Sequence, residues 1–188
     1  LADICKHNGF EFDSLIGISE GGRLAISLAA ELGVETAVTV DPPGTTKQSI
    51  LAFMKRFGID EAKGQKAVID ATPDRLMANA HTEVDSKMLV KNGLVAATKR
   101  NLYARAKAMA KDGLMNDIKK ATDNGVRIVD YRAGASTFAS SEVAIDFAQN
   151  NIGYNAVLLK GAPHGITEGS PYAVAALFAQ AKYLLKRI

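Results

Sequence analysis

The chain has 188 residues, of which 47% are hydrophobic and 23% charged, a composition typical of one globular domain with a sizeable core. The net charge is +3, and its basic residues are mixed among acidic ones, which argues against a nucleic-acid-binding protein. Cys5 is the single cysteine, so no disulfide can form within the chain, and no apolar stretch reaches the roughly 18 residues of a membrane span.

The first part of the chain alternates between strand and helix patterns. The apolar run "FDSLIGI" (12–18) predicts a buried strand. The segment "EGGRLAISLAAELG" (20–33) follows it and predicts a helix, since leucine and isoleucine recur among alanines and a glycine ends the run. The β-branched segment "TAVTV" (36–40) predicts a second strand, which "DPPG" (41–44) ends.

A long helical segment then interrupts this alternation. Residues 46–124 are almost wholly helical in pattern, and they are followed by segments typical of a strand, a helix, a strand and a closing helix: 125–132, 140–151, 154–161 and 170–188. Strands that alternate with helices predict an α/β fold with a mostly parallel sheet and flanking helices. We therefore expect a core made of residues 1–45 and 125–188, with a helical cap subdomain at 46–124.

The stretch "LIGISEGG" (15–22) carries the first functional motif. It places Ser19 between Gly17 and Gly21, where a strand passes into a helix. A tight turn of this kind strains its central residue and brings the residues two before and two after it close together, so both should be small. The Ser19 hydroxyl would then project near a helix N-terminus, which favours developing negative charge. We interpret Ser19 as a nucleophile; the alternative is a serine that only caps the helix at 20–33.

This stretch resembles the nucleophile elbow of the α/β-hydrolase superfamily, and the resemblance extends through most of the chain. It implies that the strands near 14–18, 36–40, 126–131 and 155–159 correspond to the fifth to eighth strands of that fold. The strands that precede the elbow in the family are missing. We therefore expect a fragment of a longer enzyme, or a partner chain that carries those strands, since the strand at 14–18 would otherwise be an exposed apolar edge.

His164 lies where the family places its general base. It follows the strand "NAVLLKG" in the loop "APHGITEGS", before the last helix. A serine hydroxyl is a poor nucleophile at neutral pH unless an imidazole accepts its proton. The alternative for His164 is a loop histidine with a structural hydrogen bond, and His7 and His81 are interpreted as surface residues.

The carboxylate that would orient the imidazole departs from the usual family position. The family usually supplies it after the seventh strand, where this chain has Ser136 or Thr137. Some members place it after the sixth strand, which corresponds to Asp41 and keeps the order Ser, acid, His. We choose Asp41, with a turn former before a proline as its alternative role. The remaining candidates are Asp130, Glu142, Glu168 or no acid.

These residues lead to the hypothesis of a serine hydrolase that cleaves a carboxylic ester, or an amide or thioester. Ser19 attacks the carbonyl, His164 moves the proton and Asp41 orients the imidazole. The backbone N–H of Glu20 is expected to bind the oxyanion; the family's second donor follows a strand that this chain lacks. The alternative is a non-catalytic α/β-hydrolase-like binding or interaction module.

The partner of the hypothetical enzyme is a small ester-like molecule, and neither a metal nor an organic cofactor is implied. The cap carries apolar residues that suggest an apolar acyl or alcohol group, although we favour helix packing for them: Leu51, Phe53, Met54, Phe57, Leu89 and Met109. No signal-peptide pattern occurs and the one cysteine demands no oxidising compartment, so we expect a cytoplasmic protein. The sequence does not define an oligomeric state.

Overall fold

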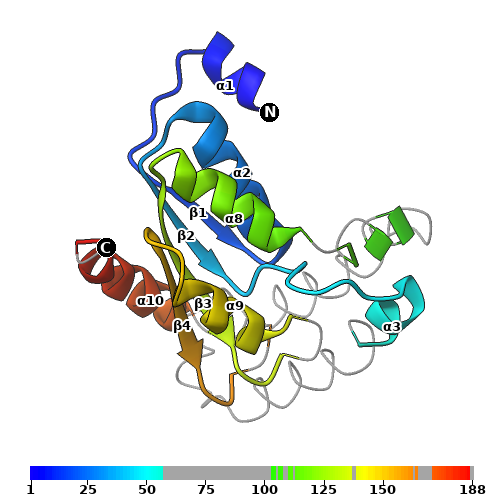
Figure 1. Ribbon diagram of the computed structural model, residues 1–188. Helices are drawn as coiled ribbons and strands as arrows, with labels where there is room; N and C mark the ends of the chain where they lie inside the picture. The colour runs from blue at the N-terminus through cyan, green and yellow to red at the C-terminus, as the bar shows by residue number, and fades with distance from the viewer. Residues whose placement is uncertain are drawn as a thin grey trace.

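The computed structural model describes residues 1–56, 103–104, 106–107, 110–111, 113–136, 139–162, 164 and 171–186. At its centre lies a sheet of four parallel strands in the order β1-β2-β3-β4 (Figure 1). The strands are β1 (Leu15–Ile18), β2 (Thr36–Val40), β3 (Arg127–Ala133) and β4 (Tyr154–Leu159). The predicted α/β class with a mostly parallel sheet is therefore confirmed.

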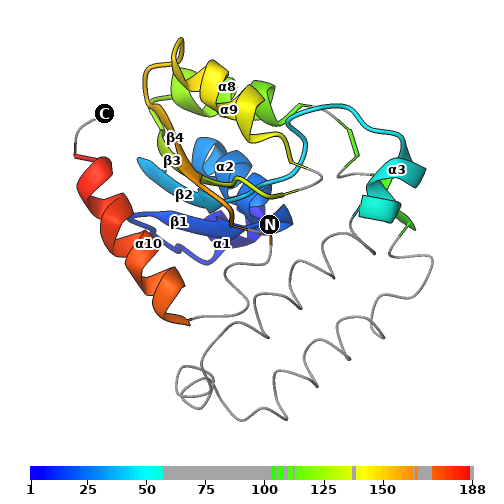
Figure 2. The ribbon, with the colours of Figure 1, turned by 90° about the horizontal axis from the view of Figure 1, so that it is seen from below.

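Helices cover both faces of this sheet. Three of them lie on one face, α2 (Glu20–Leu32), α8 (Leu114–Asp123) and α9 (Ser141–Ala148), and α10 (Pro171–Leu184) lies on the other. Figure 2 shows the sheet between these two layers. Parallel strands joined by helices are buried on both sides, which explains why β2 is buried at every residue.

Each face of the sheet has its own apolar core. Side chains alternate between the two faces along a strand, so neighbours in sequence enter different cores. On one face, Ala37 and Ile128 pack with Ile26 of α2. On the other face, Val38 and Val129 pack with Leu177 of α10.

Helix α8 belongs to the α/β core, although it lies within the segment expected to form the cap. Its buried side chains recur at helical spacing and pack with those of α2 in one cluster: Leu114, Ile118 and Ala121. The second part of the core thus begins near residue 113 rather than at 125. Residues 57–102 of the expected cap lie outside the described residues.

Two further helices are short. Helix α1 (Ala2–His7) precedes the first strand, and α3 (Ile50–Lys55) begins the segment expected to form the cap. Phe53 of α3 is buried in a cluster with Ala106, Ala110 and Ala139, so it packs between elements, whereas Leu51 is exposed. The side chains of Met54, Phe57, Leu89 and Met109 lie outside the described residues.

Strand β1 forms an edge of the sheet and pairs with β2 alone. Ile16 pairs with Val38 and Ile18 pairs with Val40. Their side chains therefore lie on the face of the sheet against which α10 packs. They are 54% and 39% exposed, and neither belongs to the buried cluster that α10 forms with β2 and β3. No strand precedes β1 within the described residues 1–14, in agreement with the missing strands expected from the sequence.

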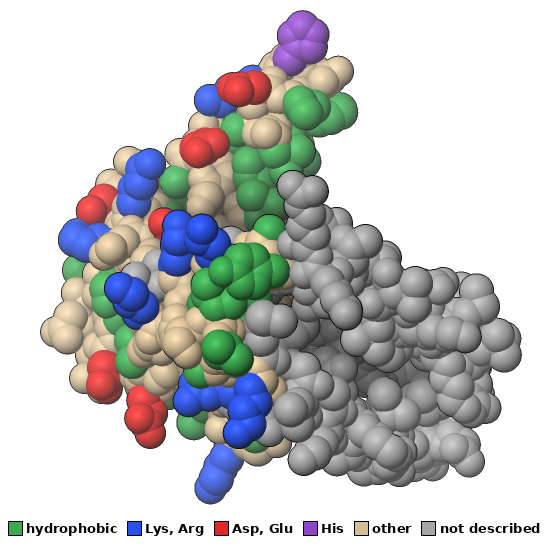
Figure 3. All heavy atoms as spheres, turned by 90° about the vertical axis from the view of Figure 1, so that its right-hand side faces the viewer, with side chains coloured by type: hydrophobic (Ala, Val, Ile, Leu, Met, Phe, Trp, Pro, Cys, Tyr) green, Lys and Arg blue, Asp and Glu red, His purple; other side chains and the backbone are tan. Residues whose placement is uncertain are grey.

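The surface of the described part carries charges of both signs. On the face drawn in Figure 3, basic and acidic side chains are scattered and hydrophobic side chains lie between them. Among the helices that the structure describes, none has both the length and the apolar character needed to cross a membrane.

Candidate active site

Ser19 occupies a strained turn between β1 and α2. Its backbone has φ 53° and ψ −126°, a region that residues with a side chain rarely adopt. The Ser19 N–H donates to the Val40 carbonyl at 2.8 Å, which ties the turn to the end of β2. The predicted strand-turn-helix geometry around Ser19 is therefore present.

The hydroxyl of Ser19 does not cap the helix that follows it. Ser19 stands at the N-cap position of α2, but its side chain accepts no hydrogen bond from that helix. In contrast, the Oγ of Ser49 accepts from the backbone N–H of Ala52 at 3.1 Å, and the Oγ of Ser140 accepts from that of Val143 at 3.5 Å. The alternative interpretation of Ser19 as a capping residue does not describe this structure.

The turn needs glycine at one of the two predicted positions. A Cβ on Gly17 would lie 2.1 Å from the backbone oxygen of Gly21, a distance that real Cβ atoms essentially never show. A Cβ on Gly21 would meet nothing within 4 Å, so the expectation that residue 21 must be small is not met. The next glycine is the tighter one, because a Cβ on Gly22 would lie 3.2 Å from the Pro42 Cβ and 3.3 Å from the Thr39 Cβ.

Asp41 occupies a similar position at the end of β2. Its backbone has φ 47°. Among the described residues other than glycine, a positive φ occurs at Ser19 and Asp41 alone. The Asp41 N–H donates to the Tyr131 carbonyl at 2.7 Å, and the Asp41 Oδ1 accepts from the Ala133 N–H at 3.1 Å. The side chain is fully buried, so both its backbone and one carboxylate oxygen are held by β3.

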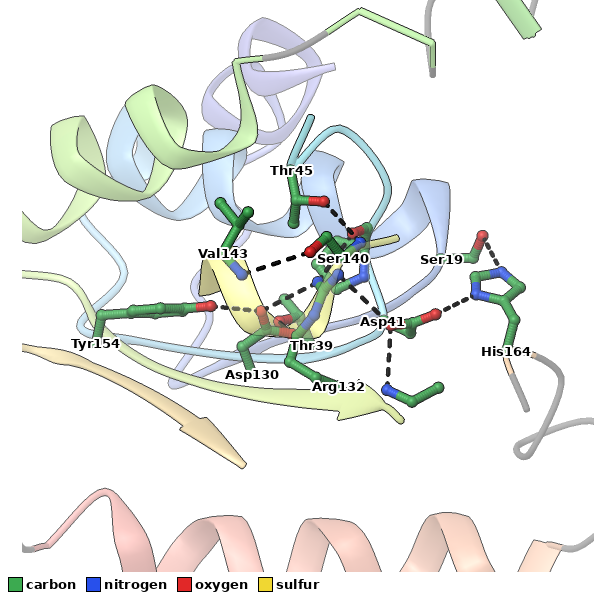
Figure 4. Close-up of polar contacts among 12 residues, drawn as sticks. Ser19, Thr39, Asp41, Thr45, Asp130, Arg132, Ser140, Val143, Tyr154 and His164 are labelled. Atoms are coloured by element: carbon green, nitrogen blue, oxygen red, sulfur yellow. Dashed lines mark hydrogen bonds and ion pairs between the residues drawn. The ribbon is translucent and has the colours of Figure 1, made fainter. Parts of the chain in front are cut away.

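His164 joins the two residues (Figure 4). Its Nδ1 lies 2.6 Å from Asp41 Oδ2, and its Nε2 lies 2.8 Å from Ser19 Oγ. A carboxylate can only accept a hydrogen bond, so Nδ1 carries the proton that is donated to Asp41. In the neutral imidazole Nε2 then accepts from the Ser19 hydroxyl, and the structure thus brings together the three residues that the sequence analysis selected.

The other candidate acids are placed elsewhere. Asp130 accepts hydrogen bonds from Thr39 Oγ1 at 2.9 Å and from the Tyr154 hydroxyl at 2.7 Å, and it does not contact His164. Ser136 makes a backbone turn at the end of β3, and Glu142 is exposed in the first turn of α9. Thr137 and Glu168, like the surface candidate His81, lie outside the described residues.

Sequence reasoning missed Arg132, a fully buried residue of β3. Its Nη1 donates to the Pro42 carbonyl at 2.9 Å and to Asp130 Oδ2 at 3.3 Å, and its Nη2 lies 3.5 Å from Asp41 Oδ1. The signal was available in "RIVDYRA", where an acid and a base stand two residues apart in an otherwise apolar strand. Residues two apart share a face of the sheet, so both charges had to be buried together.

Burial and charge oppose each other in this cluster. Burial raises the pKa of Asp130, while Arg132 and the hydroxyls of Tyr154 and Thr39 act to lower it. Burial acts to lower the pKa of Arg132, but the carboxylates of Asp130 and Asp41 outweigh it, so that pKa is raised. Desolvation and the adjacent Asp130 raise the pKa of Tyr154 well above its ordinary value.

The residue that follows Ser19 begins a helix. Glu20 follows Ser19 as the first residue of α2, so its N–H stands at a helix N-terminus. In the part of the chain that the structure describes, no group of three or more His, Cys, Asp or Glu side chains could hold a metal ion.

Comparisons with known proteins identify the fold. No protein-family model and no curated protein matches the chain by sequence. Similar solved structures include a bromoperoxidase from Bacillus anthracis, at 16% identity and TM-score 0.59, which covers 98% of this chain and 71% of that one. An esterase from Exiguobacterium antarcticum has 15% identity and TM-score 0.64 over 96% and 69% of the two chains. An enol-lactonase from Burkholderia xenovorans has 16% identity and TM-score 0.56 over 96% and 68%.

These identities are low, so the likeness concerns the fold. The chain spans about 70% of the length of these structures, in agreement with the absence of strands before β1 in its described part. From the strand that precedes Ser19 to the helix that follows His164, this chain has the fold of the α/β hydrolases.

Proposed function

We propose that the protein is a serine hydrolase that cleaves a carboxylic ester, or an amide or thioester, with Ser19, His164 and Asp41 as its catalytic triad. One observation carries the proposal. The Oγ of Ser19, both ring nitrogens of His164 and the carboxylate of Asp41 form a continuous hydrogen-bonded series, with distances of 2.8 and 2.6 Å. This is the arrangement in which an imidazole activates a serine and a carboxylate orients the imidazole.

The chemical steps follow from this series. As the Ser19 Oγ attacks the ester carbonyl carbon, its proton passes to His164 Nε2 and the carbonyl oxygen becomes an oxyanion. Collapse of the tetrahedral intermediate breaks the bond to the alcohol oxygen, which takes the proton from Nε2. The resulting acyl-serine is then attacked by water, which gives its proton to Nε2, and the carboxylic acid leaves as the Ser19 hydroxyl is restored.

Two structural features support the roles assigned to Ser19 and Asp41. The strained backbone of Ser19 turns its hydroxyl away from α2, where it would otherwise act as a cap, and toward His164. Asp41 is held by a backbone N–H from β3, so the carboxylate is oriented before any substrate binds. The absence of an acid after β3 and the missing strands were the two reasons to consider a non-catalytic module, and the contact between Asp41 and His164 argues against the first of them.

The oxyanion would be stabilised at the N-terminus of α2. In this proposal the Glu20 N–H donates to it, and the partial positive charge of the helix end adds to the effect. The second donor that such a site requires would come from a segment preceding β1, as the family resemblance implies. Because the described residues before β1 hold no strand, full activity is expected only from a protein that contains this segment.

An ester is the favoured substrate class, and the segment around 46–112 is proposed to cover it. Two of the similar structures are named an esterase and an enol-lactonase, and a lactone is a cyclic ester. Helix α3 and residues 106 and 110 bring both ends of this segment together in one buried cluster with Ala139. A cap attached at this point would lie next to the carboxyl ends of the strands, where Ser19 and Asp41 stand.

Labelling with a fluorophosphonate tests the proposal directly. The Oγ of an activated serine attacks the phosphorus and displaces fluoride, which leaves a stable adduct that mass spectrometry can locate. We expect labelling at Ser19, no labelling in Ser19→Ala or His164→Gln, and normal labelling in Ser27→Ala, a control that changes a serine within α2. If the folded full-length protein is not labelled at Ser19, the protein is a binding module rather than a serine hydrolase.

A further inference from the structure

Three fully buried charged side chains form a continuous cluster behind the candidate active site (Figure 4). Arg132 lies between two carboxylates, with Nη2 3.5 Å from Asp41 Oδ1 and Nη1 3.3 Å from Asp130 Oδ2. All three side chains have no exposed area. One positive charge is thus shared between Asp130 and the carboxylate that binds His164.

Arg132 also fixes the backbone next to Asp41. Its Nη1 donates to the carbonyl of Pro42, the residue that directly follows Asp41. Together with the bond from the Ala133 N–H to Asp41 Oδ1, this contact ties the turn to the end of β3. A change at residue 132 would therefore affect both the orientation of Asp41 and the charge next to it.

Stability alone is a weak explanation for such a cluster. Buried ion pairs lose the hydration of every charge, and replacing them with apolar side chains is often neutral or stabilising. In the described part of the chain, Nε of Arg132 donates no hydrogen bond, so the guanidinium is not fully satisfied. Buried polar groups that cost stability are retained more readily where they act on a functional site.

The charges of the cluster are matched to a protonated His164. Asp130 accepts hydrogen bonds from Arg132, from Thr39 Oγ1 and from the Tyr154 hydroxyl, a set of donors that suits an ionised carboxylate. With Asp130, Arg132 and Asp41 all charged, the cluster carries one net negative charge. When His164 takes the proton of the serine, the buried group becomes neutral as a whole.

We propose that Arg132 is a positioning residue whose charge, balanced by Asp130, sets how strongly Asp41 stabilises the protonated ring of His164. The benefit for catalysis rests on the proposed function. The coupling between these charges is independent of the proposed function, because it exists in this cluster whether or not the protein cleaves an ester. The titratable groups of the cluster, among the described residues, come from several elements. Asp41 follows β2, Asp130 and Arg132 lie in β3, Tyr154 lies in β4, and His164 lies in the loop after β4.

Two variants should move the titration of His164 in opposite directions. Arg132→Met removes the positive charge beside Asp41, so the protonated ring is better stabilised and the titration midpoint moves up by about one pH unit. Asp130→Asn keeps Arg132 but removes its other partner, so more of its charge acts on Asp41 and the midpoint moves down, by about half a unit or more. Tyr154→Phe is the matched control, because it removes a hydrogen bond from the cluster without changing its charge, and its midpoint should stay within about 0.2 units.

The midpoint is measured by NMR titration of the imidazole resonances, which are assigned among the three histidines with His164→Gln. This reading needs no catalysis, so it separates failure of the inference from failure of the proposed function. Opposite shifts support the inference, and shifts of the same sign, or none, overturn it. If Arg132→Met does not fold, Asp130→Asn decides alone, since only a downward shift supports the inference.

The same variants can be followed through catalysis where the protein is active. The acid limb of kcat/KM against pH should move in the same direction as the NMR midpoint, upward in Arg132→Met and downward in Asp130→Asn. A hydrolase whose acid limb ignores both variants would keep the proposed function, but Arg132 would lose its role as a positioning residue.

Discussion

His164 Nδ1 and Asp41 Oδ2 lie 2.6 Å apart, although 123 residues separate them in the chain. They meet because β2 and β4 run parallel on either side of β3, so the segments that leave their carboxyl ends emerge at one edge of the sheet. This is the edge at which open α/β sheets bind ligands. In the proposed triad the acid therefore lies after β2, one strand earlier than the position after β3.

Asp41→Asn tests this contact. The amide can donate to Nδ1 and so favours the wrong tautomer of His164, which leaves Nε2 protonated and unable to accept from Ser19. We expect kcat for a p-nitrophenyl ester to fall about 10³- to 10⁴-fold. The control Glu142→Gln changes an exposed acid of α9 and should leave kcat unchanged. Retained activity in Asp41→Asn would exclude Asp41 as the acid.

Gly17→Ala should destabilise the fold, whereas Gly21→Ala should not. The new Cβ at residue 17 would stand 2.1 Å from a backbone oxygen, and backbone cannot swing away as a side chain can. We expect a loss of about 3 kcal/mol or more in the free energy of unfolding. At residue 21, which lies in α2 with open space around it, alanine should be neutral or stabilising by up to about 1 kcal/mol. Urea unfolding measures both; equal losses would contradict the close approach at Gly17.

Ser19→Gly should be more stable than Ser19→Ala, although both lack the hydroxyl. Alanine keeps the strain of a side chain at φ 53°, which costs about 1 to 3 kcal/mol, and glycine relieves it at a smaller entropic cost. We expect a difference of about 1 kcal/mol in favour of glycine. The same pair at Ser27, inside α2, should differ by a similar amount in favour of alanine. Thermal and urea unfolding of the four variants would reveal whether the order reverses between the two sites.

Tyr131 should make the protein lose stability at high pH. Burial raises the pKa of Tyr131 to about 12, and its hydroxyl donates to the Leu177 carbonyl at 2.7 Å. The unfolded chain loses this proton near pH 10 while the folded protein still holds it, so the free energy of unfolding falls as the pH rises between about 10 and 12. Tyr131→Phe should be less stable than the parent by about 1 kcal/mol at pH 7, where the hydrogen bond is intact.

The difference in the free energy of unfolding between the parent protein and Tyr131→Phe should shrink above pH 10, because the ionisation of Tyr131 in the unfolded chain removes the advantage of the parent. Urea unfolding at pH 7, 10 and 11 gives this comparison, and lysine ionisation cancels because it is common to both. A difference that stays constant over this range would show that Tyr131 is not held neutral by the fold.

Much of the fold and site could be predicted from the sequence, because the determining signals are local. Strands and helices follow from apolar periodicity, and the strand at 36–40 has the predicted bounds. Ser19 stood out because a serine between two glycines, after a strand and before a helix, has few uses other than a sharp turn. The predicted boundary between core and cap was less accurate. The apolar face of α8 predicts a helix that packs on another surface, but its sequence does not identify that surface as α2.

The sequence by itself determined the order of the elements, the turn at Ser19 and the loop that carries His164, since each depends on neighbours along the chain. Only the tertiary structure decided that Asp41, and not Asp130, contacts His164, that Gly22 rather than Gly21 is tightly packed, and that Arg132 links Asp41 to Asp130. The reason is physical: these contacts join residues from different strands, and the twist and register that bring strand ends together arise only when the whole sheet has formed.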